Sequence, residues 1–344
     1  MRCRGVEFAE RPLRCGVVAL LAATAAVAAV DPGTLDSEPA PLASRSLLLD
    51  IARAGKRLVA VGERGHVLLS DDDGAKWVQA ERVPTQDLLT GVCFADDKRG
   101  IAVGHDEIVL TTQDGGRTWE QKSYKPDRQQ PLLDVWCGAD GRAIAVGAYG
   151  AYFVSTDFGS TWTEQKFEAK AAGAASPAPS ADEYAEDLGD PHLNRVVAAS
   201  PTRFYVAAEA GHLYRSDDAG ATWVELASPY EGSFFGVTPL TGDSLLAYGL
   251  RGNLFRSDDA GASWRKIETG TVAMLNDAVA LPGGGIAVIG LSGVVLVNRD
   301  GDRYELGQRS DRKGLSAAVA LGADALVTVG EAGVKRIQIG GEGA

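Results

Sequence analysis

Short apolar segments alternate with polar, glycine-rich segments along most of the chain. In one representative stretch the apolar segments are residues 132–137, 142–146, 152–155 and 161–165. The residues between them are rich in Gly and Asp, as is typical of hairpin turns. Beyond the first thirty residues, no segment shows convincingly the 3.6-residue periodicity of an amphipathic helix. The pattern therefore predicts an all-β protein in which four short strands make up each unit.

A glycine motif gives the number of these units. Its fullest form is a small apolar pair, Gly, two variable residues and a second Gly, as in residues 60–65. Copies are found at positions 61, 103, 146, 208, 248, 289 and 329, so neighbouring copies lie 40 to 43 residues apart except for one interval of 62. Four strands in about 40 residues are typical of a propeller blade. We therefore predict a seven-bladed β-propeller of four-stranded blades.

A second motif, S-x-D-x-G-x-x-W with Thr in place of Ser once, occurs five times. We expect a structural role for it, because Asp and Ser side chains bind backbone N–H groups in tight turns, Gly accepts a positive φ, and Trp fills the space between blades. The structural residues of the five copies are Asp72 and Trp77, Asp114 and Trp119, Asp157 and Trp162, Asp218 and Trp223, and Asp259 and Trp264.

The last two units depart from the repeat. The sixth has Tyr304 after an Asp-Gly-Asp sequence and no Trp, and the seventh ends near Ile339 without the motif. The seventh blade therefore lacks a final strand. A spare segment, residues 37–44, precedes the first unit, and we expect it to add to the last blade as an N-terminal strand that closes the ring.

The N-terminal thirty residues have the pattern of a signal peptide. Four arginines precede an apolar run from Gly16 to Val30 that is too short for a typical membrane span. The alternative is an uncleaved anchor. We expect residues 1–30 to be removed and residues 31–344 to form an exported propeller, in the periplasm or in the thylakoid lumen of a photosynthetic source. No other segment is long and apolar enough to span a bilayer, so the mature chain is expected to have no transmembrane segment and to be a monomer.

Charge and cysteine content narrow the partners and the chemistry. The net charge of −12 disfavours binding to nucleic acid, whose phosphates an acidic surface repels. Of the four cysteines, Cys3 and Cys15 belong to the signal peptide. Cys93 and Cys137 begin similar sequences in successive units, and we expect two buried thiols, with a disulfide as the alternative that an oxidising compartment allows.

The long third interval contains an insertion at residues 170–193. It begins with a run of Ala, Gly, Ser and Pro and continues with acidic residues around Tyr184. Such a segment suits either a disordered excursion or a loop that orders on a partner. We include Tyr184 among the candidate binding residues.

The sequence does not support a metal, a cofactor or a catalytic centre. The four histidines lack metal spacing, and the acidic run at 71–74 lacks the final Glu of a twelve-residue calcium loop. No G-x-S-x-G elbow, P-loop or H-E-x-x-H motif occurs. A glycoside hydrolase would need two facing carboxylates, and a single sequence does not show which acids face one another.

The repeated motif is the Asp-box, also called the bacterial neuraminidase repeat, which occurs in many unrelated propellers. The fuller blade, with Leu-Leu-Asp-Ile at 48–51, Ala-Val-Gly-x-x-Gly at 60–65, Ser-x-Asp-x-Gly at 70–74 and then Trp77, resembles the photosystem II stability and assembly factor family. The resemblance covers about residues 37–340. It implies seven blades and a non-catalytic scaffold that helps to build a membrane complex. Photosynthetic members are associated with an arginine patch, to which Arg64 and Arg251 correspond best here.

We therefore expect a non-enzymatic, exported protein-binding scaffold that assists the assembly or stability of a membrane complex. The alternatives are a secreted, sialidase-like glycoside hydrolase, although the Arg-Ile-Pro segment of sialidases is missing, and a periplasmic accessory protein of an exporter. Binding residues usually lie on loops held by a rigid scaffold. The candidate partner surface comprises Arg64, His105, Tyr149, Tyr184 and Arg251.

Overall fold

The computed structural model describes residues 31–171, 190–299 and 303–339. The chain divides into Met1–Asp31 and a large compact unit, Pro32–Ala344. The expected signal peptide and Tyr184 lie outside the described residues. Within the described residues, no helix is long and apolar enough to cross a membrane.

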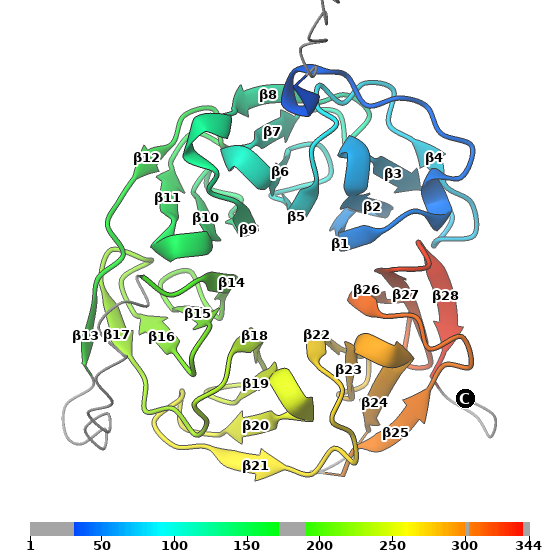
Figure 1. Cartoon of the computed structure of the whole chain (residues 1–344). Helices are drawn as coiled ribbons and strands as arrows, with labels where there is room; N and C mark the ends of the chain where they lie inside the picture. The colour runs from blue at the N-terminus through cyan, green and yellow to red at the C-terminus, as the bar shows by residue number, and fades with distance from the viewer. Residues whose placement is uncertain (1–30, 172–189, 300–302, 340–344) are drawn as a thin grey trace, which may run out of the picture. The chain divides into compact units, whose positions relative to one another are not determined.

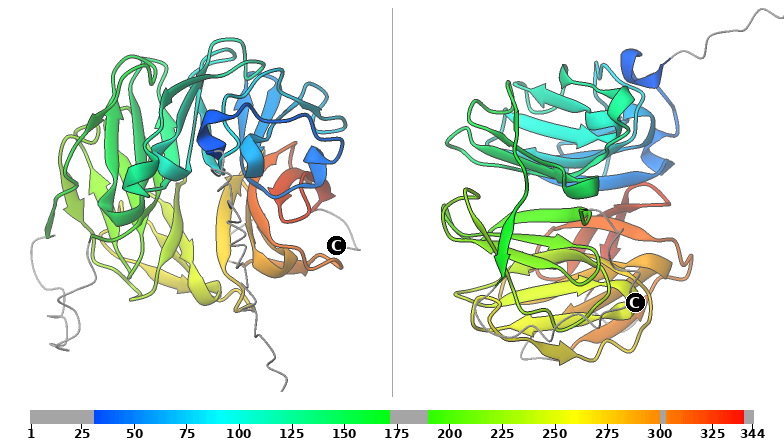
Figure 2. Two further views of the ribbon diagram at one scale, coloured as in Figure 1. Left: turned by 45° about the horizontal axis from the view of Figure 1, so that its top comes forward. Right: turned by 60° about the vertical axis from the view of Figure 1, so that its left-hand side comes forward.

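The large unit is a seven-bladed β-propeller, as predicted (Figure 1). The first strand of each blade lies beside the first strand of the next blade, and the first strand of blade 7 lies beside that of blade 1. The turned views in Figure 2 show the blades following one another around the ring.

Blades 1 to 3 are four-stranded antiparallel sheets in sequence order. Their strands are β1 (Leu48–Ala54), β2 (Arg57–Gly62), β3 (Val67–Ser70) and β4 (Val78–Gln79) in blade 1; β5 (Leu89–Phe94), β6 (Gly100–Gly104), β7 (Val109–Thr112) and β8 (Glu120–Ser123) in blade 2; and β9 (Leu132–Cys137), β10 (Ala143–Gly147), β11 (Tyr152–Ser155) and β12 (Thr163–Glu164) in blade 3.

Blades 4 to 7 continue the same order, with one added strand and one missing strand. The strands are β14 (Leu193–Ala198), β15 (Phe204–Ala208), β16 (Leu213–Ser216) and β17 (Trp223–Glu225) in blade 4, with β13 (Ala169–Ala171) added beside β17; β18 (Phe234–Pro239), β19 (Leu245–Gly249), β20 (Leu254–Ser257) and β21 (Arg265–Ile267) in blade 5; β22 (Leu275–Ala280), β23 (Ile286–Gly290), β24 (Val294–Asn298) and β25 (Glu305–Gln308) in blade 6; and β26 (Leu315–Ala320), β27 (Ala325–Gly330) and β28 (Lys335–Gln338) in blade 7.

The antiparallel register defines two faces of the ring. In blade 1, Leu48 at the start of the inner strand pairs with Gly62, next to the turn between the second and third strands. Ala54 at the other end pairs with Arg57, across the turn between the first and second strands. We call the first end the glycine-turn face, because it carries the predicted glycine motifs. The Asp-box turns, between the third and fourth strands, therefore lie on the opposite face.

The closure of the ring differs from the expected N-terminal strand. Blade 7 has three strands, and in the described part of residues 31–47 there are two short 3-10 turns, η1 (Pro32–Thr34) and η2 (Ala43–Arg45), and no strand. Pro39 and Pro41 lie within the proposed strand, and proline has no N–H to donate to a sheet. The blade therefore stays one strand short.

The N-terminal segment nevertheless lies at the seam between blades 7 and 1. The Val334 N–H donates to the Ser44 carbonyl oxygen at 3.0 Å, and Ala43 is 3% exposed. A side chain on Gly333 would collide with that carbonyl, just as one on Gly65 would collide with the Thr85 carbonyl in the connection from blade 1 to blade 2. The segment thus takes the place of a blade-to-blade connection and not that of a fourth strand.

The Asp-box turns are held by one repeated set of hydrogen bonds. In blade 1 the Ser70 hydroxyl donates to Asp72 at 2.9 Å, and the N–H groups of Gly74 and Lys76 donate to the Ser70 and Asp72 oxygens at 2.9 and 2.8 Å. The same bonds recur in the four other copies. The Trp side chains pack in the cores between blades, and Trp119 and Trp223 are almost fully buried. These residues therefore stabilise the turns and the packing between blades.

Cys93 and Cys137 form a disulfide with a Cα–Cα distance of 5.9 Å, so the expectation of two thiols is wrong. The two residues are not equivalent in register, because Cys93 pairs with Ile101, three residues before Gly104, whereas Cys137 pairs with Ala143, four residues before Gly147. Since side chains alternate along a strand, this offset of one residue turns Cys93 towards blade 3 and Cys137 towards blade 2. The disulfide therefore links the two blades across their shared core.

Candidate functional site

Four of the five candidate binding residues lie on the glycine-turn face. Arg64, Tyr149 and Arg251 occupy the same central position in the 3-10 turns η3 (Glu63–Gly65), η6 (Ala148–Gly150) and η8 (Leu250–Gly252). Their φ values are +55°, +54° and +58°, a left-handed backbone that side chains rarely adopt. His105 begins the corresponding turn of blade 2, η4 (His105–Glu107). The shared turn geometry presents each of these side chains to solvent.

These side chains are brought to one face but not into one cluster. Arg64, His105 and Tyr149 lie on the consecutive blades 1, 2 and 3, whereas Arg251 lies on blade 5. Tyr149 is 62% exposed and packs edge-on against His192, with ring centroids 4.8 Å apart. Among the described residues, neither arginine forms an ion pair. The face therefore offers two uncompensated cations and an exposed aromatic ring.

A second group of polar residues lines the central channel, and the sequence analysis did not identify it. Each of these residues is the third residue of an inner strand; they are Asp50, Asp134, Arg195 and Asp277. The Leu-x-Asp sequence at the start of three of these strands was the available signal. It marked the blade register but did not show that the aspartates meet in the channel.

The three aspartates bind the backbone of the following blade. Asp50 accepts from the Val92 N–H at 2.8 Å, Asp134 from the Val196 N–H at 2.9 Å and Asp277 from the Ala318 N–H at 2.9 Å. Asp50 and Asp277 also accept from the N–H of the next residue in the chain. Each carboxylate thus joins two neighbouring blades at the channel wall.

Arg195 is the cation that balances these acids. Its Nη1 atom lies 3.1 Å from Asp277 Oδ1, and its side chain keeps some contact with channel solvent. Burial opposes the charge of Arg195, but Asp277 and the other channel acids outweigh it and hold the arginine pKa well above its ordinary value. Burial also raises the pKa of Asp50 to about 7, against the lowering effect of Arg195. One arginine faces three acids whose charged forms burial disfavours.

A cavity of about 380 Å³ opens in the channel beside this group. Its wall includes Asp50, Asp134, Arg195 and Trp136 together with the two disulfide-bonded cysteines. A hydrolase would need one carboxyl group to donate a proton and another to attack or activate water. Both oxygens of Asp50 and both of Asp277 already accept hydrogen bonds from the backbone. The arrangement fits a structural link between blades better than a catalytic pair of carboxyl groups.

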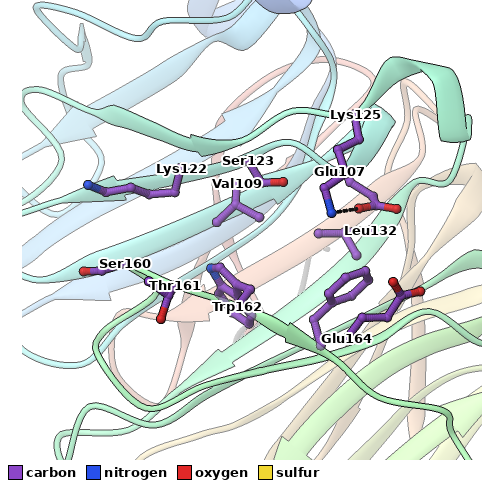
Figure 3. Close-up of a pocket in the computed structure, with 11 residues that line it drawn as sticks. Glu107, Val109, Lys122, Ser123, Lys125, Leu132, Ser160, Thr161, Trp162 and Glu164 are labelled. Carbon is purple, nitrogen blue, oxygen red and sulfur yellow. Dashed lines mark ion pairs between the residues drawn. The ribbon is translucent and has the colours of Figure 1, made fainter.

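A smaller groove of about 220 Å³ lies between blades 2 and 3 (Figure 3). Glu107 is 2% exposed at one end of it, with Lys125 Nζ 3.3 Å and Arg128 Nε 2.8 Å from its carboxylate oxygens. The rings of Phe153 and Trp162 form an apolar side. The groove therefore combines an aromatic wall with a compensated acid and basic groups.

The described residues hold no group of three or more His, Cys, Asp or Glu side chains arranged for a metal ion. The fold and these surfaces define a class of protein. It is a propeller with Asp-box turns, with exposed loop residues on one face and with carboxylates that link neighbouring blades at the channel wall. The chain belongs to the family described as photosynthesis system II assembly factor YCF48, whose family model matches residues 75–303.

Solved structures share the fold at low sequence identity. The structure of YCF48 bound to D1 peptide has a TM-score of 0.65 and 17% identity, and the match covers 86% of this chain and 94% of that one. YCF48 from Cyanidioschyzon merolae has a TM-score of 0.63 and 16% identity, with coverage of 86% and 96%. Virginiamycin B lyase from Staphylococcus aureus has a TM-score of 0.66 and 11% identity, with coverage of 84% and 94%. No curated protein matches the sequence.

The fold alone does not separate binding from catalysis, because an assembly factor and a lyase both share it. The family membership and the chemistry of the surfaces must carry the functional conclusion.

Proposed function

We propose that this protein is a non-catalytic, exported scaffold that binds an extended segment of a membrane-protein client on its glycine-turn face and assists assembly of the client's complex. The observation that carries the proposal is the membership of the YCF48 family, in which one protein was solved with a D1 peptide bound. The side chains on the face fit such a role. Arg64 and Arg251 are exposed without ion pairs among the described residues, and Tyr149 offers an exposed ring.

The arrangement favours a client segment with acidic and apolar residues. Arginine binds carboxylates through a planar, two-pronged guanidinium group, and exposed tyrosine packs against apolar side chains. Since Arg251 is on blade 5 and the other candidates are on blades 1 to 3, a single short peptide would bind near Arg64, His105 and Tyr149. A longer client segment would be needed to reach Arg251 as well.

A sialidase-like hydrolase is the main alternative, and the channel carboxylates are the residues that would serve it. The hydrogen bonds to Asp50 and Asp277 argue against it, because these oxygens are engaged with backbone N–H groups. An accessory role in a membrane exporter would use the same binding face and differ only in the client.

Affinity capture from membranes of the source organism, read by mass spectrometry, tests the proposal. We expect the wild-type protein to retain a membrane protein and the double variant Arg64→Ala/Tyr149→Ala to lose it. Lys56→Ala is the matched control, because Lys56 is an exposed cation at the turn between β1 and β2, on the opposite face. Retention that is equal in the double variant, or turnover of a sialoside by the wild-type protein, would contradict the proposal.

A further inference from the structure

The groove between blades 2 and 3 has a filled counterpart one blade further along the ring. Two residues form facing walls of the open groove. Val109 in blade 2 lies three residues before the Asp-box Thr112, and Phe153 in blade 3 lies two residues before the Asp-box Ser155. At the interface of blades 3 and 4 the residues at these two registers are Tyr152 and Tyr214. The Asp-box tryptophan is Trp162 in the open groove and Trp223 in its counterpart. The two interfaces therefore compare position by position.

Phe167 fills the counterpart between blades 3 and 4. Its ring centroid lies 5.4 Å from that of Tyr152, 4.9 Å from that of Tyr214 and 5.4 Å from that of Trp223. Two residues later the chain forms β13, which pairs in parallel with β17. An extended segment thus adds to the outer edge of blade 4 while its aromatic side chain enters the groove.

The interface of blades 1 and 2 shows a related arrangement, in which the buried residue follows the bridged one and the bridge lies just before β8. Arg82 forms a parallel bridge with Thr118, and the Trp119 N–H donates to the Arg82 carbonyl oxygen at 3.0 Å. Val83, the next residue, is 1% exposed in the core between these blades. Two interfaces of this ring are therefore sealed by an extended segment that pairs with the outer strand and inserts one apolar side chain.

The interface of blades 2 and 3 has the groove but not the segment. Tyr124 follows Trp119 by five residues, as Phe167 follows Trp162, yet it packs with the core of blades 1 and 2. Its ring lies against Gly33, where a Cβ atom would come within 2.1 Å of it. β12 is the end strand of its sheet, and in the described part of the chain no strand pairs with its outer edge. Among the described residues no aromatic side chain takes the place of Phe167 here: the Phe153 ring is 6% exposed with Lys125 Nζ 6.0 Å from its centroid, and no strand pairs with the outer edge of β12.

We propose that this groove is a second docking site, which takes an extended peptide of a partner protein in parallel with β12. The peptide places one aromatic side chain between Phe153 and Trp162 and carries small residues from the second position after it, as Ala169 follows Phe167. Backbone hydrogen bonds to the strand edge supply affinity, and the aromatic side chain supplies selectivity. The site lies on the outer wall between blades, so it goes beyond the function proposed for the glycine-turn face.

The test uses a fluorescent peptide with the sequence of residues 165–171, which contains Phe167, and the full-length protein. We expect saturable binding by fluorescence anisotropy, and loss of binding when Phe in the peptide is replaced by Ala. The variant Phe153→Ala should weaken binding by more than about tenfold, because it removes one of the two rings between which the aromatic side chain of the peptide packs. Phe255→Ala is the control, since Phe255 is 4% exposed and lies two residues before Ser257 in blade 5, at the register of Phe153.

Hydrogen exchange of the complex locates the peptide. Protection of residues 162–164 supports the proposal, whereas protection of residues 223–225 would show that the peptide displaces β13 and would overturn it. Absence of saturable binding, or equal affinity in Phe153→Ala and the wild-type protein, would also overturn it. Binding that appears only after deletion of residues 172–189 would show that the chain's own insertion occupies the groove, and would equally contradict a partner peptide.

Discussion

Aspartates in this ring serve two purposes that are distinguished by their surroundings. In the Asp-box turns, bonds from Thr161 to Asp157 and from Thr222 to Asp218 lower the pKa of each carboxyl group, because they favour the charged form. In the channel, burial raises the pKa of Asp50, Asp134 and Asp277. An ionised aspartate thus stabilises an Asp-box turn, whereas ionisation of a channel aspartate destabilises the folded state.

The channel aspartates give the stability of the protein a particular pH dependence. Because the pKa of Asp50 is raised from 3.8 to about 7, the folded state binds its proton more tightly than the unfolded state. The stability that this group contributes is therefore complete below its unfolded pKa and is lost as the pH rises towards 7. We expect the free energy of unfolding, measured in urea, to fall from pH 5 to pH 8 more steeply for the wild-type protein than for Asp50→Ala.

Asp97→Ala provides the control for this experiment, because Asp97 is an exposed aspartate in the turn between β5 and β6. Its pH profile should follow that of the wild-type protein. A profile of Asp50→Ala that is parallel to the wild-type profile over this range would show that the Asp50 carboxyl group is not the source.

The strands illustrate what local sequence determines. The apolar segments 132–137 and 152–155 coincide with β9 and β11, because hydrophobic pattern and turn residues act over a few positions. β12 is shorter than the segment 161–165 that was expected. An outer strand has one partner, here β11, so fewer backbone hydrogen bonds fix its length than in a strand with a partner on each side.

The disulfide shows where local sequence misleads. Aligning Cys93-Phe94-Ala95-Asp96 with 137–140 places the two cysteines at equivalent positions, and equivalent side chains on neighbouring blades point the same way round the ring. The register pairs reveal an offset of one residue, which makes the side chains face each other. Counted from Leu89 and Leu132 at the starts of the inner strands, Cys93 is the fifth residue and Cys137 the sixth, and an alignment that begins at the cysteines hides this difference.

We expect the disulfide to stabilise the interface of blades 2 and 3. It closes a loop with a sequence separation of 44 residues, so its removal should cost about 2–4 kcal/mol through the added freedom of the unfolded chain. The double variant Cys93→Ser/Cys137→Ser should unfold at lower urea concentration than the wild-type protein. Reducing agent should shift the wild-type transition by a similar amount and leave the variant unchanged; a wild-type transition that does not respond to reduction would contradict a stabilising bond.

The complete ring depends on contacts that no single repeat specifies. Seven glycine motifs give the number of blades, but the route of residues 31–47 follows from Pro39 and Pro41 and from the open end of blade 7. The channel group likewise forms only when strands from blades 1, 3, 4 and 6 meet. The open groove between blades 2 and 3 depends on the direction in which Tyr124 packs. These are properties of the closed ring, which is why sequence patterns predicted the blades better than the sites.

The seam between blades 7 and 1 is the place to test how the ring closes. Ala43 is 3% exposed there, whereas the adjacent Leu42 is 61% exposed. Ala43→Glu would bury an unpaired charge against the core formed by blades 7 and 1, and should destabilise the fold by about 3 kcal/mol. Leu42→Glu places the same charge in solvent and should leave the melting temperature near that of the wild-type protein. If the two variants have the same melting temperature, the N-terminal segment does not stabilise the seam, and the three strands of blade 7 close the ring without it.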